Sequence, residues 1–90
     1  MSLYIVRSKD GCPSCVAAKN LLLSKGIEFV EERYDDNEER QAMYDRLGLV
    51  GAARTVPQIT YTRDGATIYV GGFQNLGGFI EGRELEEAFG

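Results

Sequence analysis

Short apolar runs alternate along the chain with segments whose apolar residues recur at helical spacing, and this pattern predicts strands and helices in turn. Runs rich in β-forming residues predict strands at 3–6, 27–30, 58–61 and 66–70. Helical spacing between capping and glycine signals predicts helices at 13–25, 37–47 and 74–89. The order is therefore β-α-β-α-β-β-α, and the short crossover between the first two strands favours their parallel pairing. We expect a single α/β domain over residues 1–90, with a mixed sheet.

The first predicted helix has clear start and stop signals. Cys12 stands at its cap, Pro13 occupies the first helical position, where a missing N–H is harmless, and Gly26 ends the helix. The apolar positions that we expect to face the core are Val16, Ala17, Leu21 and Leu22. The polar positions that we expect to face solvent are Lys19, Asn20 and Ser24.

Local cap and turn signals delimit the later elements. Asp36 followed by Glu39 is typical of a capped helix start. The Asp64-Gly65 pair supplies the positive φ angles that a tight hairpin turn needs. We expect the last helix to be interrupted at its glycines, which are Gly77, Gly78 and Gly82.

Composition and charge exclude several functions. The net charge is −4 and no stretch is rich in Lys or Arg, whereas nucleic-acid binding needs concentrated positive charge. The acidic runs at 28–39 and 81–87 are typical of solvated helix faces. No apolar run approaches the roughly 18 residues that span a bilayer, and the N-terminus lacks the features of a signal peptide. We therefore expect a cytoplasmic protein without nucleic-acid or membrane partners.

The only two cysteines, Cys12 and Cys15, form a Cys-x-x-Cys pair, and the chain has no histidine. Structural zinc needs about four protein ligands, which cysteine and histidine cannot supply here, so no metal is expected. Haem attachment requires a histidine directly after the second cysteine, where Val16 stands. A redox pair and an inert structural disulfide remain. The disulfide is the less favoured interpretation, because closing so short a loop stabilises little.

The position of the cysteine pair favours redox chemistry. The pair follows a predicted strand and opens a helix, so the first thiol meets unpaired N–H groups and the positive end of the helix dipole. Such surroundings lower a thiol pKa from roughly 8.5 to about 3.5–7.5, and Lys9 adds positive charge nearby. We expect Cys12 to be the exposed nucleophile. Cys15, one turn further along, should be more buried and act as the resolving thiol.

Three separate segments resemble the glutaredoxin family. The segment KDGCPSC at 9–15 resembles the family's active site, in which a lysine stands three places before Cys-Pro-Tyr-Cys. The segment ARTVPQI at 53–59 resembles its Thr-Val-Pro segment, and GGFQNL at 71–76 resembles its double-glycine segment. The segments occur in the family's order and at plausible separations. Together they are far more specific than a Cys-x-x-Cys pair alone.

The resemblance implies a thioredoxin-type fold, with helices on both faces of a four-stranded sheet. It also implies that the Val56–Pro57 bond is cis and that the Val56 backbone faces the cysteines. There an extended glutathione would pair with the backbone in the manner of an added strand. Without the family, Pro57 would be read simply as a proline at a strand entry.

The resemblance implies glutathione as the co-substrate. Lys9 would meet its glycine carboxylate, and Arg40 or Gln41 would reach the same end. The N–H groups of Gln74 and Asn75, at a helix start, would hold the γ-glutamyl carboxylate. An ordinary solvated loop lysine is the alternative interpretation of Lys9. The full set of implied glutathione-binding residues is Lys9, Ser14, Thr55, Val56, Pro57, Gly71, Gly72, Gln74 and Asn75.

Two residues depart from the family pattern. Ser14 replaces the usual tyrosine and removes an aromatic wall beside the thiol. Asn75 stands where the family often has aspartate, so a charge contact to the glutathione ammonium is lost. Because charge-assisted hydrogen bonds are roughly twice as strong as neutral ones, we expect glutathione to bind more weakly than in typical members.

The implied function is glutathione-dependent reduction of protein disulfides and glutathionylated proteins by a monomeric enzyme that uses Cys12 and Cys15. Two alternatives remain open. One is a thioredoxin-like electron donor, for example to ribonucleotide reductase, that a reductase keeps reduced. The other is a dimer that bridges an iron–sulfur cluster through Cys12 and two glutathione molecules, for which the small Ser14 could make room.

Overall fold

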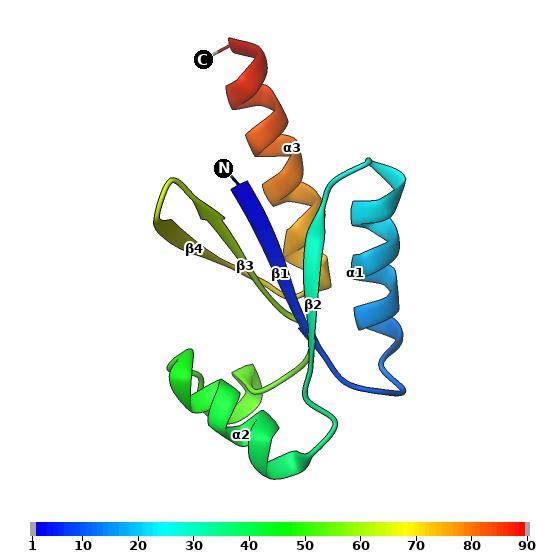
Figure 1. Ribbon diagram of the computed structural model, residues 1–90, viewed down its shortest axis with the longest axis vertical. Helices are drawn as coiled ribbons and strands as arrows, with labels where there is room; N and C mark the ends of the chain where they lie inside the picture. Colours follow the sequence, from blue (N-terminus) through cyan, green and yellow to red (C-terminus); the bar gives the residue numbers. More distant parts are fainter. Residues whose placement is uncertain (1, 90) are drawn as a thin grey trace.

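The computed structural model describes residues 2–89 and shows a four-stranded sheet with three α-helices (Figure 1). The elements are β1 (Ser2–Ser8), α1 (Pro13–Ser24), β2 (Phe29–Arg33), α2 (Asn37–Arg46), a short 3-10 helix (Gly51–Ala53), β3 (Gln58–Arg63), β4 (Ala66–Gly71) and α3 (Phe73–Phe89). The predicted order β-α-β-α-β-β-α is confirmed. None of these helices in residues 2–89 is long and apolar enough to cross a bilayer.

The sheet has the strand order β2-β1-β3-β4. β1 pairs in parallel with β2, and Tyr4 lies opposite Phe29. β1 also pairs antiparallel with β3, where Tyr4 lies opposite Tyr61, and β3 pairs antiparallel with β4. The predicted mixed sheet is therefore confirmed. Its central strands β1 and β3 bring the loop after β1 and the loop before β3 to the same end of the sheet (Figure 1).

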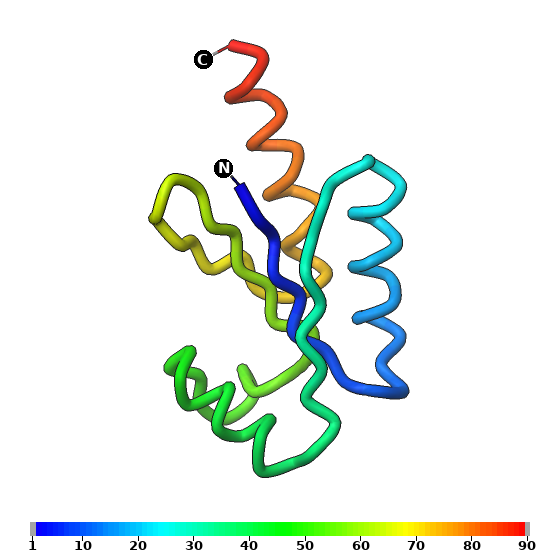
Figure 2. The backbone as a smooth tube through the Cα atoms, in the orientation of Figure 1, coloured from blue at the N-terminus to red at the C-terminus, as the bar shows by residue number. Residues whose placement is uncertain are grey.

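One face of the sheet carries the main hydrophobic core, because α1 and α3 pack on it and on each other. Figure 2 shows these two helices beside the sheet. It also shows α2 at the end of the molecule where β1 ends. α2 meets the opposite face of the sheet, where Met43 and Leu47 line a cavity with Arg7 and Glu32. The buried core residues are Tyr4, Val6, Ala18, Leu22, Ile59, Tyr61, Val70, Leu76 and Ile80.

Three aromatic rings join the sheet to α3. The ring centroids of Tyr4 and Tyr61 lie 4.7 Å apart, and the ring of Phe79 meets Tyr61 edge-on at 5.4 Å. Edge-on and tilted arrangements suit the ring quadrupoles. Burial raises the pKa of Tyr4 to about 12, so its phenol stays neutral and is compatible with the core.

Two expectations for the helices are wrong. Val16 is exposed, because the face of α1 that meets the sheet runs through Cys15, Ala18 and Leu22 instead. The cap at Cys12 sets the rotation of α1 about its axis, and this rotation turns Val16 to solvent. α3 is continuous through its glycines, because buried Leu76 and Ile80 anchor it and each interior glycine costs only about 1 kcal/mol.

Strand ends also differ from the prediction, whereas the turns agree with it. β2 begins at Phe29, not at residue 27, and continues through charged residues to Arg33 because β1 supplies backbone partners along its length. The Asp36 carboxylate accepts a hydrogen bond from the Glu39 N–H at 3.0 Å, which confirms the predicted cap. The hairpin turn has φ of 51° at Asp64 and 84° at Gly65, as the Asp-Gly signal predicts.

Two neighbouring leucines of α1 test the assigned core face. Leu22 is fully buried, whereas the Leu23 side chain is 63% exposed. We expect Leu22→Ala to lower the free energy of unfolding by about 2–5 kcal/mol, because it removes buried methyl groups and leaves a cavity. Leu23→Ala, the matched control, should change it by less than about 0.5 kcal/mol. Urea unfolding measures both, and equal losses would contradict the assigned helix face.

Candidate active site

Cys12 and Cys15 form a disulfide at the N-terminus of α1, with their Cα atoms 5.3 Å apart. Cys12 is the N-cap residue, with φ −110° and ψ 100°, and its Sγ accepts a hydrogen bond from the Cys15 N–H at 3.1 Å. The Cys12 carbonyl accepts a further bond from the Val16 N–H at 3.2 Å. Pro13 fills the first helical position, as predicted. The Cys12 sulfur therefore lies where the helix dipole favours negative charge.

The two cysteines differ in exposure, though less than the sequence predicts. Cys15 is 1% exposed and Cys12 is 9% exposed. The greater burial of Cys15 agrees with the prediction, whereas the expectation of an openly exposed Cys12 is wrong for this disulfide form. The reason is tertiary: the Val56 carbonyl oxygen lies 3.7 Å from the Cys12 sulfur, on a segment far away in sequence.

The segment before β3 has the backbone that the family resemblance implies. The Val56–Pro57 peptide bond is cis, and Pro57 is buried. No hydrogen bond within residues 2–89 uses the Val56 N–H. Thr55, by contrast, is exposed and donates its N–H to the Ala53 carbonyl at 2.9 Å. A free backbone donor therefore lies beside the cysteine pair.

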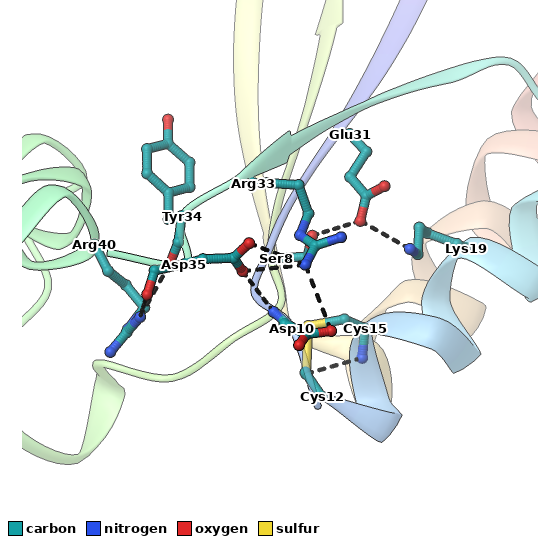
Figure 3. Close-up of polar contacts among 10 residues, drawn as sticks. All are labelled: Ser8, Asp10, Cys12, Cys15, Lys19, Glu31, Arg33, Tyr34, Asp35 and Arg40. Atoms are coloured by element: carbon teal, nitrogen blue, oxygen red, sulfur yellow. Dashed lines mark hydrogen bonds and ion pairs between the residues drawn. A yellow bond between two sulfur atoms is a disulfide. The ribbon is translucent and has the colours of Figure 1, made fainter. Parts of the chain in front are cut away.

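The loop between β1 and Cys12 is held by β2 and the residues after it (Figure 3). The Asp35 carboxylate accepts a hydrogen bond from the Asp10 N–H at 2.7 Å, and Arg33 binds the same carboxylate at 3.1 Å. Arg33 also lies 3.7 Å from the Asp10 carboxylate. The Asp10 N–H and then Arg33 lower the pKa of Asp35. This carboxylate therefore fixes the loop that leads to Cys12.

A second carboxylate joins β1, β2 and α1 next to the cysteine helix. Glu31 accepts hydrogen bonds from the fully buried Ser8 hydroxyl at 2.6 Å and from the Lys19 ammonium at 2.8 Å. Lys19 first, and then Ser8, lower the pKa of Glu31. Lys19 is therefore only partly exposed, unlike the solvent-facing lysine that helical spacing predicts. Figure 3 shows this group beside the first turns of α1.

The double-glycine segment lies between β4 and α3, and the backbone conformation of its first residue requires glycine. Gly71 has φ of 107°, and a Cβ there would lie 2.6 Å from the Asn75 Nδ2. A Cβ on Gly72 would lie 3.0 Å from the Gln74 Oε1. The Asn75 N–H donates to the Gly72 carbonyl at 3.1 Å. Gln74 and Asn75 are thus in the first turn of α3, and their side chains fold back over the glycines.

The side chains expected at the glycine end of glutathione differ in whether they already have hydrogen-bond partners. Lys9 is exposed, and no hydrogen bond or ion pair within residues 2–89 uses its ammonium. The Arg40 guanidinium donates to the Tyr34 carbonyl at 2.9 Å and to Asn37 at 3.0 Å. Gln41 accepts a bond from Arg54 at 2.8 Å. Arg40 and Gln41 are therefore engaged in the local structure of α2, whereas Lys9 is available to a ligand. Ser14 is exposed on the first turn of α1.

The candidate residues named from the sequence omit several that shape the site. Asp35, Glu31 and Gln58 each bind a segment next to the cysteines. Their partners lie on other elements, so local sequence patterns do not mark them. The nearest signal is a polar residue placed just beyond a strand, as at Asp35 two residues after the end of β2, or within one, as at Glu31.

The arrangement is suited to thiol–disulfide exchange. One sulfur receives an N–H hydrogen bond at a helix start, and its partner is buried within reach of it. A free backbone N–H lies on the facing segment. Among residues 2–89, no group of three or more His, Cys, Asp or Glu side chains is placed to hold a metal ion.

Comparison with solved structures assigns the fold class. Glutaredoxin 1 of Francisella tularensis superposes with a TM-score of 0.74 and 29% identity, over 90% of this chain and 94% of that one. A buckwheat glutaredoxin, solved in complex with glutathione, superposes with a TM-score of 0.66. Its identity is 22%, over 93% of this chain and 73% of that one, so this likeness concerns the fold alone. The chain has the thioredoxin-like fold, with a dithiol pair at the start of its first helix.

Comparison with protein families gives the narrower assignment. The glutaredoxin family model matches residues 4–64. A probable glutaredoxin of Synechocystis is 40% identical over 76 residues, which cover 83% of this chain and 63% of that relative. The chain therefore belongs to the glutaredoxin family, which uses glutathione. The matched part spans less than two thirds of this relative's length.

The Glu31 group makes stability depend on pH. The pKa of Glu31 is lower in the folded protein than its ordinary value, so the ionised carboxylate favours folding. This contribution is fully present above the unfolded pKa of about 4.3 and is lost as the pH falls through the lower folded pKa. We expect Glu31→Gln to lower the unfolding temperature at neutral pH, and the difference from wild type to shrink in acid.

Thermal unfolding across a pH series measures this difference. Glu28→Gln, which changes an exposed carboxylate in the turn before β2, is the matched control. A Glu31→Gln difference that stays constant from neutral pH into acid would show that the carboxylate charge is not what stabilises the fold.

Proposed function

We propose that this protein is a glutathione-dependent thiol–disulfide oxidoreductase that reduces glutathionylated proteins and protein disulfides. The observation that carries the proposal is the hydrogen bond from the Cys15 N–H to the Cys12 sulfur at the start of α1. That bond and the helix dipole stabilise a thiolate on Cys12 once the disulfide is reduced.

With a glutathionylated substrate, one cysteine suffices. The Cys12 thiolate attacks the glutathione sulfur of the mixed disulfide, a Cys12–glutathione disulfide forms, and the substrate sulfur leaves as a thiolate that takes a proton. A second glutathione thiolate then attacks the glutathione sulfur on Cys12. Oxidised glutathione is released and the Cys12 thiolate returns. One glutathione thiol is thereby oxidised for each mixed disulfide reduced, and the other half of the oxidised glutathione comes from the substrate.

With a protein disulfide, both cysteines take part. The Cys12 thiolate attacks the substrate and forms a mixed disulfide with it. Cys15 loses its proton and attacks the Cys12 sulfur, which releases the reduced substrate and forms the Cys12–Cys15 disulfide seen here. Two glutathione molecules then restore the dithiol and leave as oxidised glutathione. The deep burial of Cys15 supports this division, because only an intramolecular partner reaches it readily.

The glutathione site that we propose draws on three segments of the chain: the loop before Cys12, the segment around Val56 and the start of α3. The Val56 backbone would pair with the extended tripeptide, since its N–H is free within residues 2–89. The exposed Lys9 would meet the glycine carboxylate. The start of α3 would hold the γ-glutamyl carboxylate through N–H groups. The proposed contacts are Lys9, Ser14, Thr55, Val56, Pro57, Gly71, Gly72, Gln74 and Asn75, with Arg40 and Gln41 as further candidates at the glycine end.

One comparison tests the choice of reductant. Reduction of a disulfide-containing protein is followed with glutathione plus glutathione reductase, and separately with thioredoxin reductase, as the sole electron source. We expect turnover with glutathione and little with thioredoxin reductase. The reverse preference would overturn the proposed function in favour of a thioredoxin-like electron donor.

The two cysteines should differ in their roles. We expect Cys12→Ser to abolish every exchange reaction, because only Cys12 presents a thiolate. Cys15→Ser should lose reduction of protein disulfides and keep deglutathionylation, because the one-cysteine route does not need it. Turnover of a glutathionylated peptide and of a disulfide-containing protein measures the two reactions. Substantial activity in Cys12→Ser would show that the nucleophile is assigned to the wrong residue.

Local charge should govern glutathione binding. Both the protein and glutathione carry net negative charge at neutral pH, so long-range attraction cannot drive their association. An exposed charge pair is worth about 0.2–1 kcal/mol, so Lys9→Ala should raise KM for a glutathionylated peptide by a factor between about 1.4 and about 5. The effect should shrink as salt rises, because exposed charges are screened beyond roughly 8–10 Å.

Steady-state kinetics at low and high salt test the Lys9 effect. Lys25→Ala is the matched control, since Lys25 is an exposed lysine at the other end of α1, paired with Glu84 at 3.3 Å. If Lys9→Ala and Lys25→Ala behaved alike at low salt, Lys9 would be an ordinary solvated loop lysine.

A further inference from the structure

Gln58 is a buried polar residue that has no role in the exchange reactions or in the glutathione contacts proposed above. It follows Pro57 directly and begins β3, and its side chain is 2% exposed. Burying an amide without hydrogen bonds is costly, so a buried glutamine needs specific partners. Its neighbours in β3 alternate between the main core and the opposite face of the sheet. Gln58 therefore lies on the face away from α1 and α3.

The side-chain amide of Gln58 uses three of its hydrogen-bonding capacities. The Nε2 group donates to the Thr55 carbonyl at 2.7 Å and to the Ala53 carbonyl at 3.2 Å. The Oε1 atom accepts a bond from the Tyr69 hydroxyl on β4. An amide is the only neutral side-chain group that both donates twice and accepts in this way. Gln58 thus ties the sheet to the turn that precedes Val56.

The opposite side of the same turn is held by α2. The Arg54 guanidinium donates to the Leu49 carbonyl and to Gln41, each at 2.8 Å, and it pairs with Asp45. It also lies over the Tyr44 ring, with 5.8 Å between the guanidinium carbon and the ring centroid. The turn at 53–55 is therefore fixed from two directions. The Gln58 contacts are the ones that lie next to the cysteine-facing segment.

We propose that Gln58, supported by Tyr69, is a positioning residue that sets where the Val56 backbone lies relative to the Cys12 sulfur. It touches neither sulfur, and it acts through the Thr55 and Ala53 carbonyls. The free Val56 N–H and the carbonyl 3.7 Å from the Cys12 sulfur move with that turn. This inference rests on the proposed function, since it makes Gln58 a determinant of affinity for the glutathione moiety of the substrate.

Loss of the Gln58 contacts should change KM and leave kcat nearly unchanged. Gln58→Leu should raise KM for a glutathionylated peptide about fivefold to tenfold, because both bonds to the turn are lost. The kcat should stay within about twofold, because the Cys15 N–H and the helix dipole still stabilise the Cys12 thiolate. Tyr69→Phe keeps the ring and removes only the hydroxyl, so it should raise KM by about twofold to threefold.

A matched control lies on the same hairpin. Thr62 and Thr67 share a hydrogen bond of 3.0 Å, at the end of β3 and β4 away from the cysteines. Thr62→Val removes that bond and should leave KM unchanged. A second readout is amide hydrogen exchange at Arg54 and Thr55, whose N–H groups donate to the Gly51 and Ala53 carbonyls. Exchange at both should speed up at least about tenfold in Gln58→Leu and stay at the wild-type rate in Thr62→Val.

The two readouts separate failure of this inference from failure of the proposed function. If KM and exchange were unchanged in Gln58→Leu and Tyr69→Phe while the wild type turned over with glutathione, the role of Gln58 would be refuted and the proposed function would stand. Equal KM increases in Thr62→Val would also refute it. If the wild type showed no glutathione-dependent turnover, the proposed function would fail, and exchange would then decide whether Gln58 positions the turn.

Discussion

The cap at the start of α1 is the interaction on which the site depends. A helix leaves its first N–H groups without partners, and here the Cys12 sulfur accepts one of them. The same contact sets the rotation of the helix, so Cys15 turns inward and Val16 outward. The chemistry and the packing of α1 therefore share one origin. A change that moved the cap by one residue would alter both the sulfur environment and the buried face.

The sheet brings three distant segments to that cap. Because β1 lies between β2 and β3, the loop after β1, the segment after β2 and the turn before β3 meet at one end. Asp35 binds the first of these through the Asp10 N–H, and Gln58 holds the third. The cysteine pair thus lies between two backbone segments that are each fixed by a side-chain hydrogen bond from another element.

The forces at this end of the sheet differ from those that hold the core. The core packs α1 and α3 against one face through apolar and aromatic contacts. The site relies on hydrogen bonds and ion pairs, several of them exposed, which are individually weak. Buried Ser8 and Gln58 are exceptions, since each amide or hydroxyl is satisfied where water is excluded.

Local signals in the sequence determined the order of elements, the cap at Cys12, the Asp36 cap and the Asp-Gly turn, because each depends on residues a few positions apart. They also located the two reactive sulfurs, and family resemblance added the cis bond before Pro57. Only the tertiary structure decided the exposure of Cys12, the continuity of α3 and the partners of Asp35, Glu31 and Gln58. These depend on which strands pair and on what covers each side chain, and periodicity along one segment contains no record of the segment that packs against it.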